Sequence, residues 1–521
     1  MADRTQPIGP AGWTGIAAAA AIPVLILATV LALVSQAEGG RGLSAADWAA
    51  IRFTLWQAAA SSLISILLAI PLARALARRQ FVGRGLMVTL LGAPFLLPVI
   101  VAIFGLIAVF GRNGILNTAL EAFGLPQVSI YGAHGVILAH VFFNLPLAAR
   151  LILQGWSSIP SERFRLAASL GMSPGAVQRH LEWPMLQRVV PGAFLVIFVI
   201  CTTSFAVALT LGGGPRATTV ELAIYQALRF EFDLTRAAVL SMIQLAITGS
   251  VALVALRHLA RPGFGAGLNR PIQRWDADGS TLIGIDTLAI ASAALFLLTP
   301  ILMVVLNGAL GLFTLPEPVW RAAGRSIAVA FASTCLVVAS ALVMAEASTR
   351  LRGNWSIGIE ASALLAIAAS PLVVGTGLFI LIFPFASPGD LALPVTVLVN
   401  AFVTLPFALR ALLPARKSTE EDFGRLAAML NLTGLAKFRV MVLPRLRAPL
   451  GFAAGLAAAL SMGDLGVIAL FADPNGGTLP LQIFRLMGAY RMDDAAAASV
   501  LLLILSFAAF AVFDRWGQRG A

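Results

Sequence analysis

Charged residues are scarce in this sequence. Of its 521 residues, 12% are Asp, Glu, Lys or Arg and 59% are hydrophobic, whereas about a quarter of a soluble domain is charged. So few charged groups cannot cover a soluble enzyme of this size, and we expect the chain to lie in a lipid bilayer. Its net charge of +12 is then best placed in cytoplasmic loops, and no nucleic-acid partner is predicted.

Residues that carry catalysis or bind metals are also scarce. The two cysteines, Cys201 and Cys335, lie in apolar runs without Cys or His neighbours at ligand spacing, so disulfides and structural zinc are not expected. The apolar segments have no paired carboxylates, HExxH spacing or Ser/His constellation, and no GxxxxGK[ST] phosphate-binding loop exists. We therefore predict no enzyme activity, metal site or cofactor, and no ATP hydrolysis by that route.

Long apolar runs, by contrast, are abundant. A membrane-spanning helix needs about 20 apolar residues, and windows of about 19 residues predict an all-α membrane protein with about 12 transmembrane helices. The first run is too long for the core of a signal peptide. The predicted spans are residues 16–34, 55–72, 86–110, 135–153, 191–211, 237–256, 288–306, 326–345, 362–383, 393–412, 453–470 and 495–512.

The basic residues predict the orientation of these spans. An even number of spans places both termini on one side, and that side then holds 26 of the 36 Lys and Arg residues. Since basic loops stay in the cytoplasm, both termini are predicted to be cytoplasmic. The two longest cytoplasmic loops, residues 155–190 and 414–448, are where a cytoplasmic partner is expected to bind.

The sequence contains an internal repeat. The Leu-Pro pair and Arg of residues 145–150 recur at residues 405–410, Pro184 recurs as Pro444, and Asp233 recurs as Asp493. All these matches lie 260 residues apart (405 minus 145, and 444 minus 184). We call this offset the repeat shift. Chance matches are common in a sequence rich in Ala and Leu, but matches of Pro, Arg and Asp are harder to explain in that way. The repeat predicts a duplicated protein.

Two halves follow, residues 1–265 and 266–521, with six spans each. Because six is even, the halves enter the membrane in the same direction and form parallel repeats related by an axis along the membrane normal. A solute path between the halves is expected.

The long cytoplasmic loop of each half carries one pattern. Each reads R-L-A-A and two further residues, then a residue suited to a left-handed backbone, Gly171 in the first half and Asn431 in the second. Pro184 and Pro444 follow these two residues at the same spacing and restrict the chain as it returns to the membrane. A short helix, a turn and a second helix are predicted in each loop.

This pattern resembles the E-A-A loop of ABC importer permeases, whose coupling helix docks on a cytoplasmic ATPase. The resemblance implies two ATPase subunits, one for each loop, as separate partners. Arg165 and Arg425 stand where that family has Glu, so we expect an acidic or polar ATPase partner for them. The residues implied in ATPase coupling are Arg165, Leu166, Ala167, Ala168, Gly171, Pro184, Arg425, Leu426, Ala427, Ala428, Asn431 and Pro444.

A longer resemblance extends through most of the chain. Residues 139–150, 211–228 and 462–471 are similar to the fused permeases of bacterial thiamine importers. The resemblance implies a subunit of the bacterial inner membrane that takes up thiamine or its phosphates from a periplasmic binding protein. Related fused permeases import ferric iron, which remains the alternative.

Asp464 is the only acidic residue inside the twelve windows. A charge in the bilayer is costly and usually functional, so Asp464 is a candidate for guiding a cationic solute, and Ser204 is its repeat mate. The alternative is that Asp464 caps or kinks the helix beside Gly463. A secondary transporter, which would need several such groups, is disfavoured. His140 and Asn144 are expected to form interhelical hydrogen bonds.

The outer loops, residues 211–236 and 471–494, are also repeat mates. They begin with Gly-rich turns and carry charged side chains that we expect to be exposed. These loops are the predicted docking surface for the binding protein, with plain solvated hairpins as the alternative. The candidate docking residues are Arg216, Glu221, Arg229 and Arg491.

Overall fold

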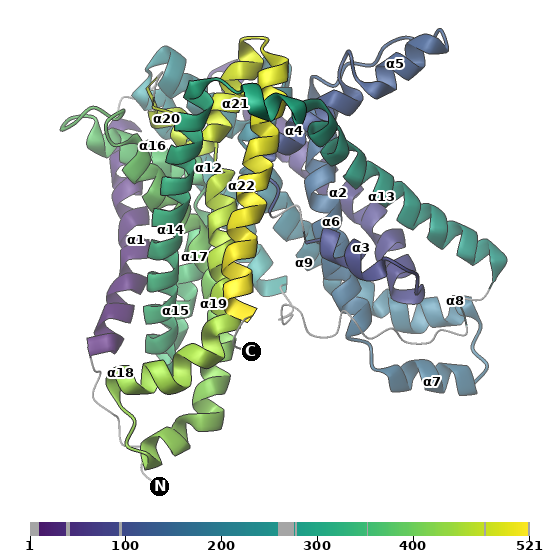
Figure 1. Ribbon diagram of the computed structural model, residues 1–521, viewed down its shortest axis with the longest axis vertical. Helices are drawn as coiled ribbons and strands as arrows, with labels where there is room; N and C mark the ends of the chain where they lie inside the picture. The colour runs from purple at the N-terminus through teal and green to yellow at the C-terminus, as the bar shows by residue number, and fades with distance from the viewer. Residues whose placement is uncertain are drawn as a thin grey trace. The chain divides into compact units, whose positions relative to one another are not determined.

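The computed structural model is all-α. It describes residues 10–37, 42–92, 96–258, 276, 279–351, 353–473 and 476–518, and no strand occurs in these ranges (Figure 1). The predicted boundary between the halves, at residues 265 and 266, lies outside the described residues, as does most of the basic loop from Arg257 to Arg274.

Eleven helical segments in the described part of the chain are long and apolar enough to cross a membrane. The predicted class, an all-α protein with many spans, is confirmed. The spanning segments include α1 (Pro10–Ala37), α2 (Ala45–Arg78), α4 (Val99–Phe110) with α5 (Ile115–Ala122), α6 (Ala133–Ser157), α12 (Leu234–His258), α13 (Ser280–Gly308), α14 (Glu317–Arg350), α17 (Ala392–Met429) and α22 (Met492–Gln518).

The predicted span at residues 86–110 is divided between α3 (Arg84–Leu90) and α4. The predicted span at residues 362–383 is also divided into two shorter helices. These are α15 (Asn354–Ala368) and α16 (Pro371–Ile382). Pro371 has no backbone N–H to continue α15 and disfavours a helical conformation at the residue before it. The side chain of Ser370 instead caps α16 by accepting a hydrogen bond from the backbone N–H of Leu372.

The two remaining long segments follow the coupling loops and repeat each other. In the first half, α8 (Pro174–Val177), the π-helical turn η2 (Gln178–Glu182), α9 (Trp183–Thr202) and α10 (Ala206–Leu211) follow in order. The second half has the same order of elements, which are α18 (Gly434–Lys437), η7 (Phe438–Val442), α19 (Leu443–Met462) and α20 (Gly466–Phe471). Each of these elements begins and ends one repeat shift after its counterpart, as the sequence repeat predicts.

The chain forms two compact units. One comprises Met1–Arg41, Ile224–Leu245 and Gly311–Ala521, and the other comprises Gly42–Ala223 and Ala246–Leu310. In the first unit α14, α17, α19 and α22 pack together, and in the second α2, α6 and α9 do so. In the repeat α14, α17 and α19 correspond to α2, α6 and α9, so each unit is built around one copy of it.

The first helix of each predicted half belongs to the unit built around the other copy. α1 packs on α14, α15 and α16, and α13 packs on α2 and α4 (Figure 1). These helices approach each other so closely that only glycine fits at two of the contacts. A Cβ atom added to Gly377 would lie 2.5 Å from Cβ of Thr29, and one added to Gly105 would lie 2.4 Å from the carbonyl oxygen of Pro300. Such small-residue contacts are typical of helix packing in membranes.

The remaining helices connect these segments. They are α3 (Arg84–Leu90), α7 (Ser161–Ser169), η3 (Pro215–Ala217), α11 (Val220–Gln226), η4 (Ala227–Glu231), η6 (Leu310–Thr314) and α21 (Leu479–Gly488).

Candidate functional site: coupling segments and solute path

The two coupling segments, residues 161–182 and 421–442, turn in the same way. Gly171 and Asn431 both have a left-handed backbone, with φ of 61° and 51°. Before each turn the helix ends in a Schellman motif. In the first segment the N–H of Met172 donates to the carbonyl of Ala167, and the equivalent bond is present at the equivalent position of the second segment. The predicted helix, turn and helix are therefore present in both loops.

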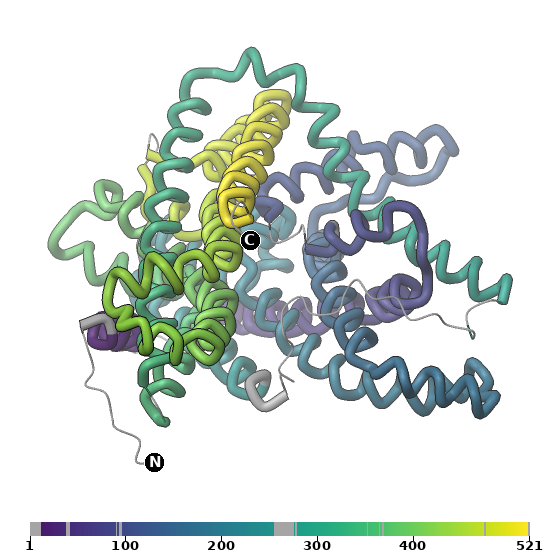
Figure 2. Tube along the Cα trace, turned by 60° about the horizontal axis from the view of Figure 1, so that its bottom comes forward, coloured from purple at the N-terminus to yellow at the C-terminus, as the bar shows by residue number. Residues whose placement is uncertain are grey.

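The helix before the turn differs between the segments. In the first segment it is a separate helix, α7, whereas in the second it is the end of the long helix α17, which can be followed in Figure 2. Pro160 precedes α7 and restricts the backbone before it. Its counterpart is Glu420, a good helix former, so α17 continues without a break.

Large apolar side chains at matching positions of the two segments are exposed. The exposed fractions are 60% for Leu166 and 51% for Leu426, and 68% for Leu170 and 62% for Leu430. Arg165, Ala168, Arg425 and Ala428 are exposed as well, whereas Ala167 and Ala427 are buried. Exposed apolar groups that gather at one site usually mark an interaction surface.

The first coupling segment is bound to the end of α2 by an ion pair. Nε of Arg74 lies 2.9 Å from Oε2 of Glu182, whose side chain is buried, and Nη2 of Arg78 lies 3.7 Å from Oε1 of the same carboxylate. Arg74 also donates through Nη2 to the side-chain oxygen of Gln178 at 3.2 Å. These contacts fix the helix that follows the turn.

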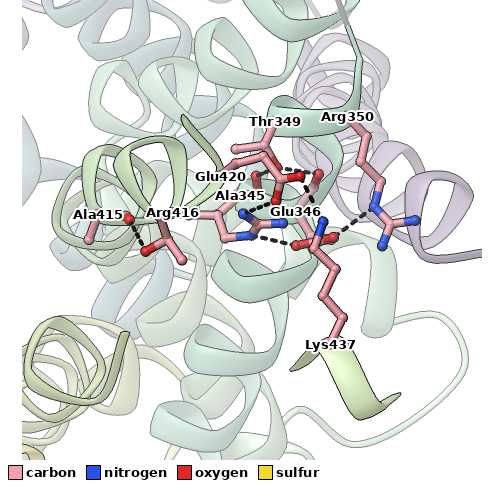
Figure 3. A network of polar contacts seen from close by, with 9 residues as sticks. Ala345, Glu346, Thr349, Arg350, Ala415, Arg416, Glu420 and Lys437 are labelled. Carbon is pink, nitrogen blue, oxygen red and sulfur yellow. Dashed lines mark hydrogen bonds and ion pairs between the residues drawn. The ribbon is translucent and has the colours of Figure 1, made fainter. Parts of the chain in front are cut away.

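The second coupling segment is bound to the end of α14 by a larger network (Figure 3). Arg416 donates through Nε to Oε2 of Glu346 at 2.6 Å and through Nη1 to Oε2 of Glu420 at 2.8 Å. Lys437 donates to Oε1 of Glu420 at 2.7 Å, and Arg350 donates to Oε1 of Glu346 at the same distance. The network joins α14, α17 and α18.

Asp464 lies at a break between α19 and α20, and Ser204 lies at the equivalent break between α9 and α10. The Oδ1 atom of Asp464 accepts a hydrogen bond from the N–H of Gly466 at 3.2 Å, so the residue caps α20. Its Oδ2 atom is buried and has no hydrogen-bond partner. The cap expected as the alternative is present, and the contact of Asp464 with a solute stays a prediction.

His140 and Asn144 are buried on α6. Asn144 donates through Nδ2 to the backbone carbonyl of His140 at 2.8 Å and lies 3.4 Å from Sγ of Cys201 on α9. The predicted interhelical hydrogen bond is therefore present for Asn144. The same prediction for His140 is wrong, because both of its ring nitrogens are buried without a hydrogen-bond partner in the described part of the chain.

The predicted docking residues of the outer loops have different surroundings. Arg216, Arg229 and Arg491 are exposed, and Arg491 forms an ion pair with Asp494 at 2.6 Å. The expectation that Glu221 is exposed is wrong. It lies in α11, which is buried from Val220 to Tyr225, and the N–H of Val220 donates to the hydroxyl of Thr54. The apolar residues beside Glu221 were the signal for this burial.

Three arginines gather around three backbone carbonyls of the second outer loop, a feature that no local sequence pattern indicated. Arg229, Arg485 and Arg325 donate to the backbone carbonyls of Ala472, Asp473 and Gly477 at 3.0 to 3.2 Å. Burial lowers the pKa of Arg485, and the nearby Arg229 and Arg325 lower it further. The three guanidinium groups therefore hold the backbone of this loop.

Comparison with known proteins decides the family. No family model matches the chain. It is 40% identical to the thiamine transport system permease protein ThiP of Brucella abortus (strain 2308), over 99% of this chain and 97% of that protein. The chain belongs to the thiamine transport system permease family. The family member from Escherichia coli (strain K12) is 38% identical and that from Salmonella typhimurium is 37% identical, each over 100% of this chain and 99% of its own length.

A more distant relative is the probable sulfate transport system permease protein cysT of Helicosporidium, which is 27% identical over 39% of this chain and 76% of its own length. The three thiamine permeases named above, in contrast, match 99% or more of this chain.

Proposed function

We propose that the chain is the permease subunit of an ATP-driven importer that moves thiamine or its phosphates from the periplasm to the cytoplasm. The similarity to thiamine transport permeases over nearly the whole chain supports this function best. The chain itself is a transport subunit of the bacterial inner membrane and not an enzyme, and a partner ATPase supplies the energy.

The two coupling segments are the proposed contacts with two copies of that ATPase. Their exposed leucines occupy matching positions, as expected of two surfaces that bind the same partner. Arg165 and Arg425 are exposed beside them and would meet an acidic or polar group of the ATPase. We propose that both termini lie in the cytoplasm, as the basic loops predict, and that residues 1–265 and 266–521 are the two repeated halves.

Asp464, with Ser204 at the equivalent break, is the proposed contact of the solute path. Thiamine carries a positive charge, which the free oxygen of a buried carboxylate can attract. The outer loops are proposed to receive a periplasmic binding protein through Arg216, Arg229 and Arg491. Glu221 is removed from this surface because it is buried.

Crosslinking tests the ATPase contacts. Cysteine is placed at Ala168 or Ala428, both exposed, in a chain whose Cys201 and Cys335 are replaced by serine. Both sites are expected to crosslink to the ATPase in the assembled complex. Cysteine at Arg491 in the outer loop is the control and should not crosslink. An intact complex in which neither coupling site reacts would overturn the proposed contacts.

Uptake into proteoliposomes tests the substrate. With the ATPase and binding protein present, labelled thiamine should accumulate only when ATP is supplied. Accumulation of ferric iron instead would favour the iron importer, and accumulation that follows an ion gradient without ATP would favour a secondary transporter.

A further inference from the structure

The helices α2 and α14 correspond in the two halves. One position near their ends, counted back from the last residue, nevertheless carries opposite charges in the two helices. Both helices have 34 residues and end in arginine, at Arg78 and Arg350. One helical turn before these ends stand Arg74 in the first half and Glu346 in the second. Arg74 forms an ion pair with Glu182 in the first coupling segment, and Glu346 forms one with Arg416 of α17, the helix that enters the second segment.

We call the helix before each turn the incoming arm and the residues from the turn to the membrane helix the outgoing arm. Arg74 and Glu346 form ion pairs with opposite arms in the two halves. In the first half Arg74 binds the outgoing arm, through Glu182 and Gln178. In the second half Glu346 binds the incoming arm, through Arg416 of α17.

The second segment has an additional link between its two arms. Glu420 on the incoming arm accepts hydrogen bonds from Arg416 beside it and from Lys437 on the outgoing arm. The counterparts of Glu420 and Lys437 in the first half are Pro160 and Val177, which cannot form an ion pair. Both arms of the second segment are therefore tied to α14, whereas the first segment is tied to α2 by its outgoing arm.

Burial makes two of these links, those of Arg416 and Glu182, resistant to separation. The side chain of Arg416 is 2% exposed and that of Glu182 is 1% exposed. Moving either group away from its partner would leave a buried charge without compensation, which is strongly unfavourable. When a coupling segment moves, the end of α2 or α14 must then move with it.

We propose that these ion pairs are positioning devices that pass movement of the coupling segments to the membrane helices. Arg74 with Glu182 serves the first half, and Glu346, Arg416, Glu420 and Lys437 serve the second. This inference rests on the proposed function, because it requires an ATPase that moves the segments. The second segment and α14 move as one body, whereas the first segment bends at Pro160 and pulls α2 through Glu182.

Substitution of Lys437 tests the proposal. Its side chain is partly exposed, and it follows the turn at Asn431 and is not among the residues implied in ATPase coupling. In the complete complex in proteoliposomes, Lys437→Met should lower the thiamine imported per ATP hydrolysed by about fivefold, the lower end of typical coupling effects. ATP hydrolysis should continue. Lys437→Arg keeps the charge and should restore the ratio.

Lys417→Met is the matched control. Lys417 also joins two helices, by a 2.7 Å pair with Glu360, but both side chains are 40% exposed, and exposed pairs contribute little. This variant should import the same amount of thiamine per ATP as the unchanged protein.

Three results would overturn the proposal. The import ratio could stay unchanged in Lys437→Met, or Lys437→Arg could lower it as much as Lys437→Met does. The Lys437→Met complex could also lose the ATPase crosslink at position 428, which would mean that the pair holds the ATPase in place and does not transmit movement. Failure of the proposed function would differ from all three, because the crosslinks would then be absent in the unchanged chain.

If Lys437→Met assembles poorly, Glu182→Gln tests the same idea in the first half. It removes the charge that binds Arg74 and keeps the shape of the side chain. We expect it too to lower thiamine import per ATP. Normal import per ATP by this variant would contradict the role of the first ion pair.

Discussion

At the scale of single residues, the sequence located chemically unusual side chains but did not determine their surroundings. Asp464 stood out as an acid in an apolar window, and the structure places it at a helix break as a cap. Glu346 lies just beyond the predicted window 326–345, and Arg416 and Lys437 counted only as loop charges. Their network depends on which distant helices meet, so local sequence could not reveal it.

The cap and the proposed charge contact of Asp464 can be separated by two substitutions. Asp464→Asn keeps an oxygen that can accept from the N–H of Gly466 but removes the charge. We expect thiamine uptake to fall by about tenfold, which corresponds to about 1.4 kcal/mol, while the amount of folded protein and ATP hydrolysis stay near normal. Asp464→Ala also removes the cap and should destabilise the protein by about 1 kcal/mol.

Labelled thiamine uptake and thermal unfolding of the purified complex measure the two effects. Normal uptake by Asp464→Asn would leave Asp464 as a helix cap only and remove it from the solute path.

At the scale of elements, the repeat predicted more than the hydropathy windows did. The repeat shift predicted matching turns, and the structure gives four elements with matching ends in each half. Hydropathy alone missed the division of the ninth span, although Pro371 was a visible signal. It also missed the difference between α7 and the continuous α17, which follows from Pro160 in one copy and Glu420 in the other.

The turns of the coupling segments should differ in how they tolerate substitution. Gly171 has a left-handed backbone, and a Cβ atom there would meet nothing within 4 Å. Gly171→Ala should therefore raise the free energy of the folded turn by about 1 kcal/mol, because alanine adopts a left-handed backbone less readily than glycine. About 1 kcal/mol makes local opening of the turn about fivefold more frequent. Hydrogen exchange at the amide of Met172 should therefore become about fivefold faster.

Asn431→Gly is the matched substitution in the second segment. Glycine adopts the left-handed conformation more readily than asparagine, so exchange at the amide of Leu432 should be unchanged or slower. Faster exchange in Asn431→Gly than in the unchanged chain would contradict this account of the turns.

At the scale of the whole molecule, the exchange of first helices could not be predicted from the sequence. Hydropathy places α1 in the first half and α13 in the second, and no local pattern states which helices they contact. In the structure each belongs to the unit built around the other copy of the repeat. Neither half therefore contains all the helices of a compact unit.

Separate expression of the two halves tests this consequence. Residues 1–265 lack the partners of α1, and residues 266–521 lack those of α13, so each half alone would leave glycine-lined helix surfaces such as the one at Gly377 uncovered. We expect each half alone to be degraded rapidly in cells. When both are produced together, they should copurify through a tag on one half and restore thiamine uptake. A half that is stable to protease by itself, and whose stability does not increase when the other is present, would contradict the exchange of α1 and α13.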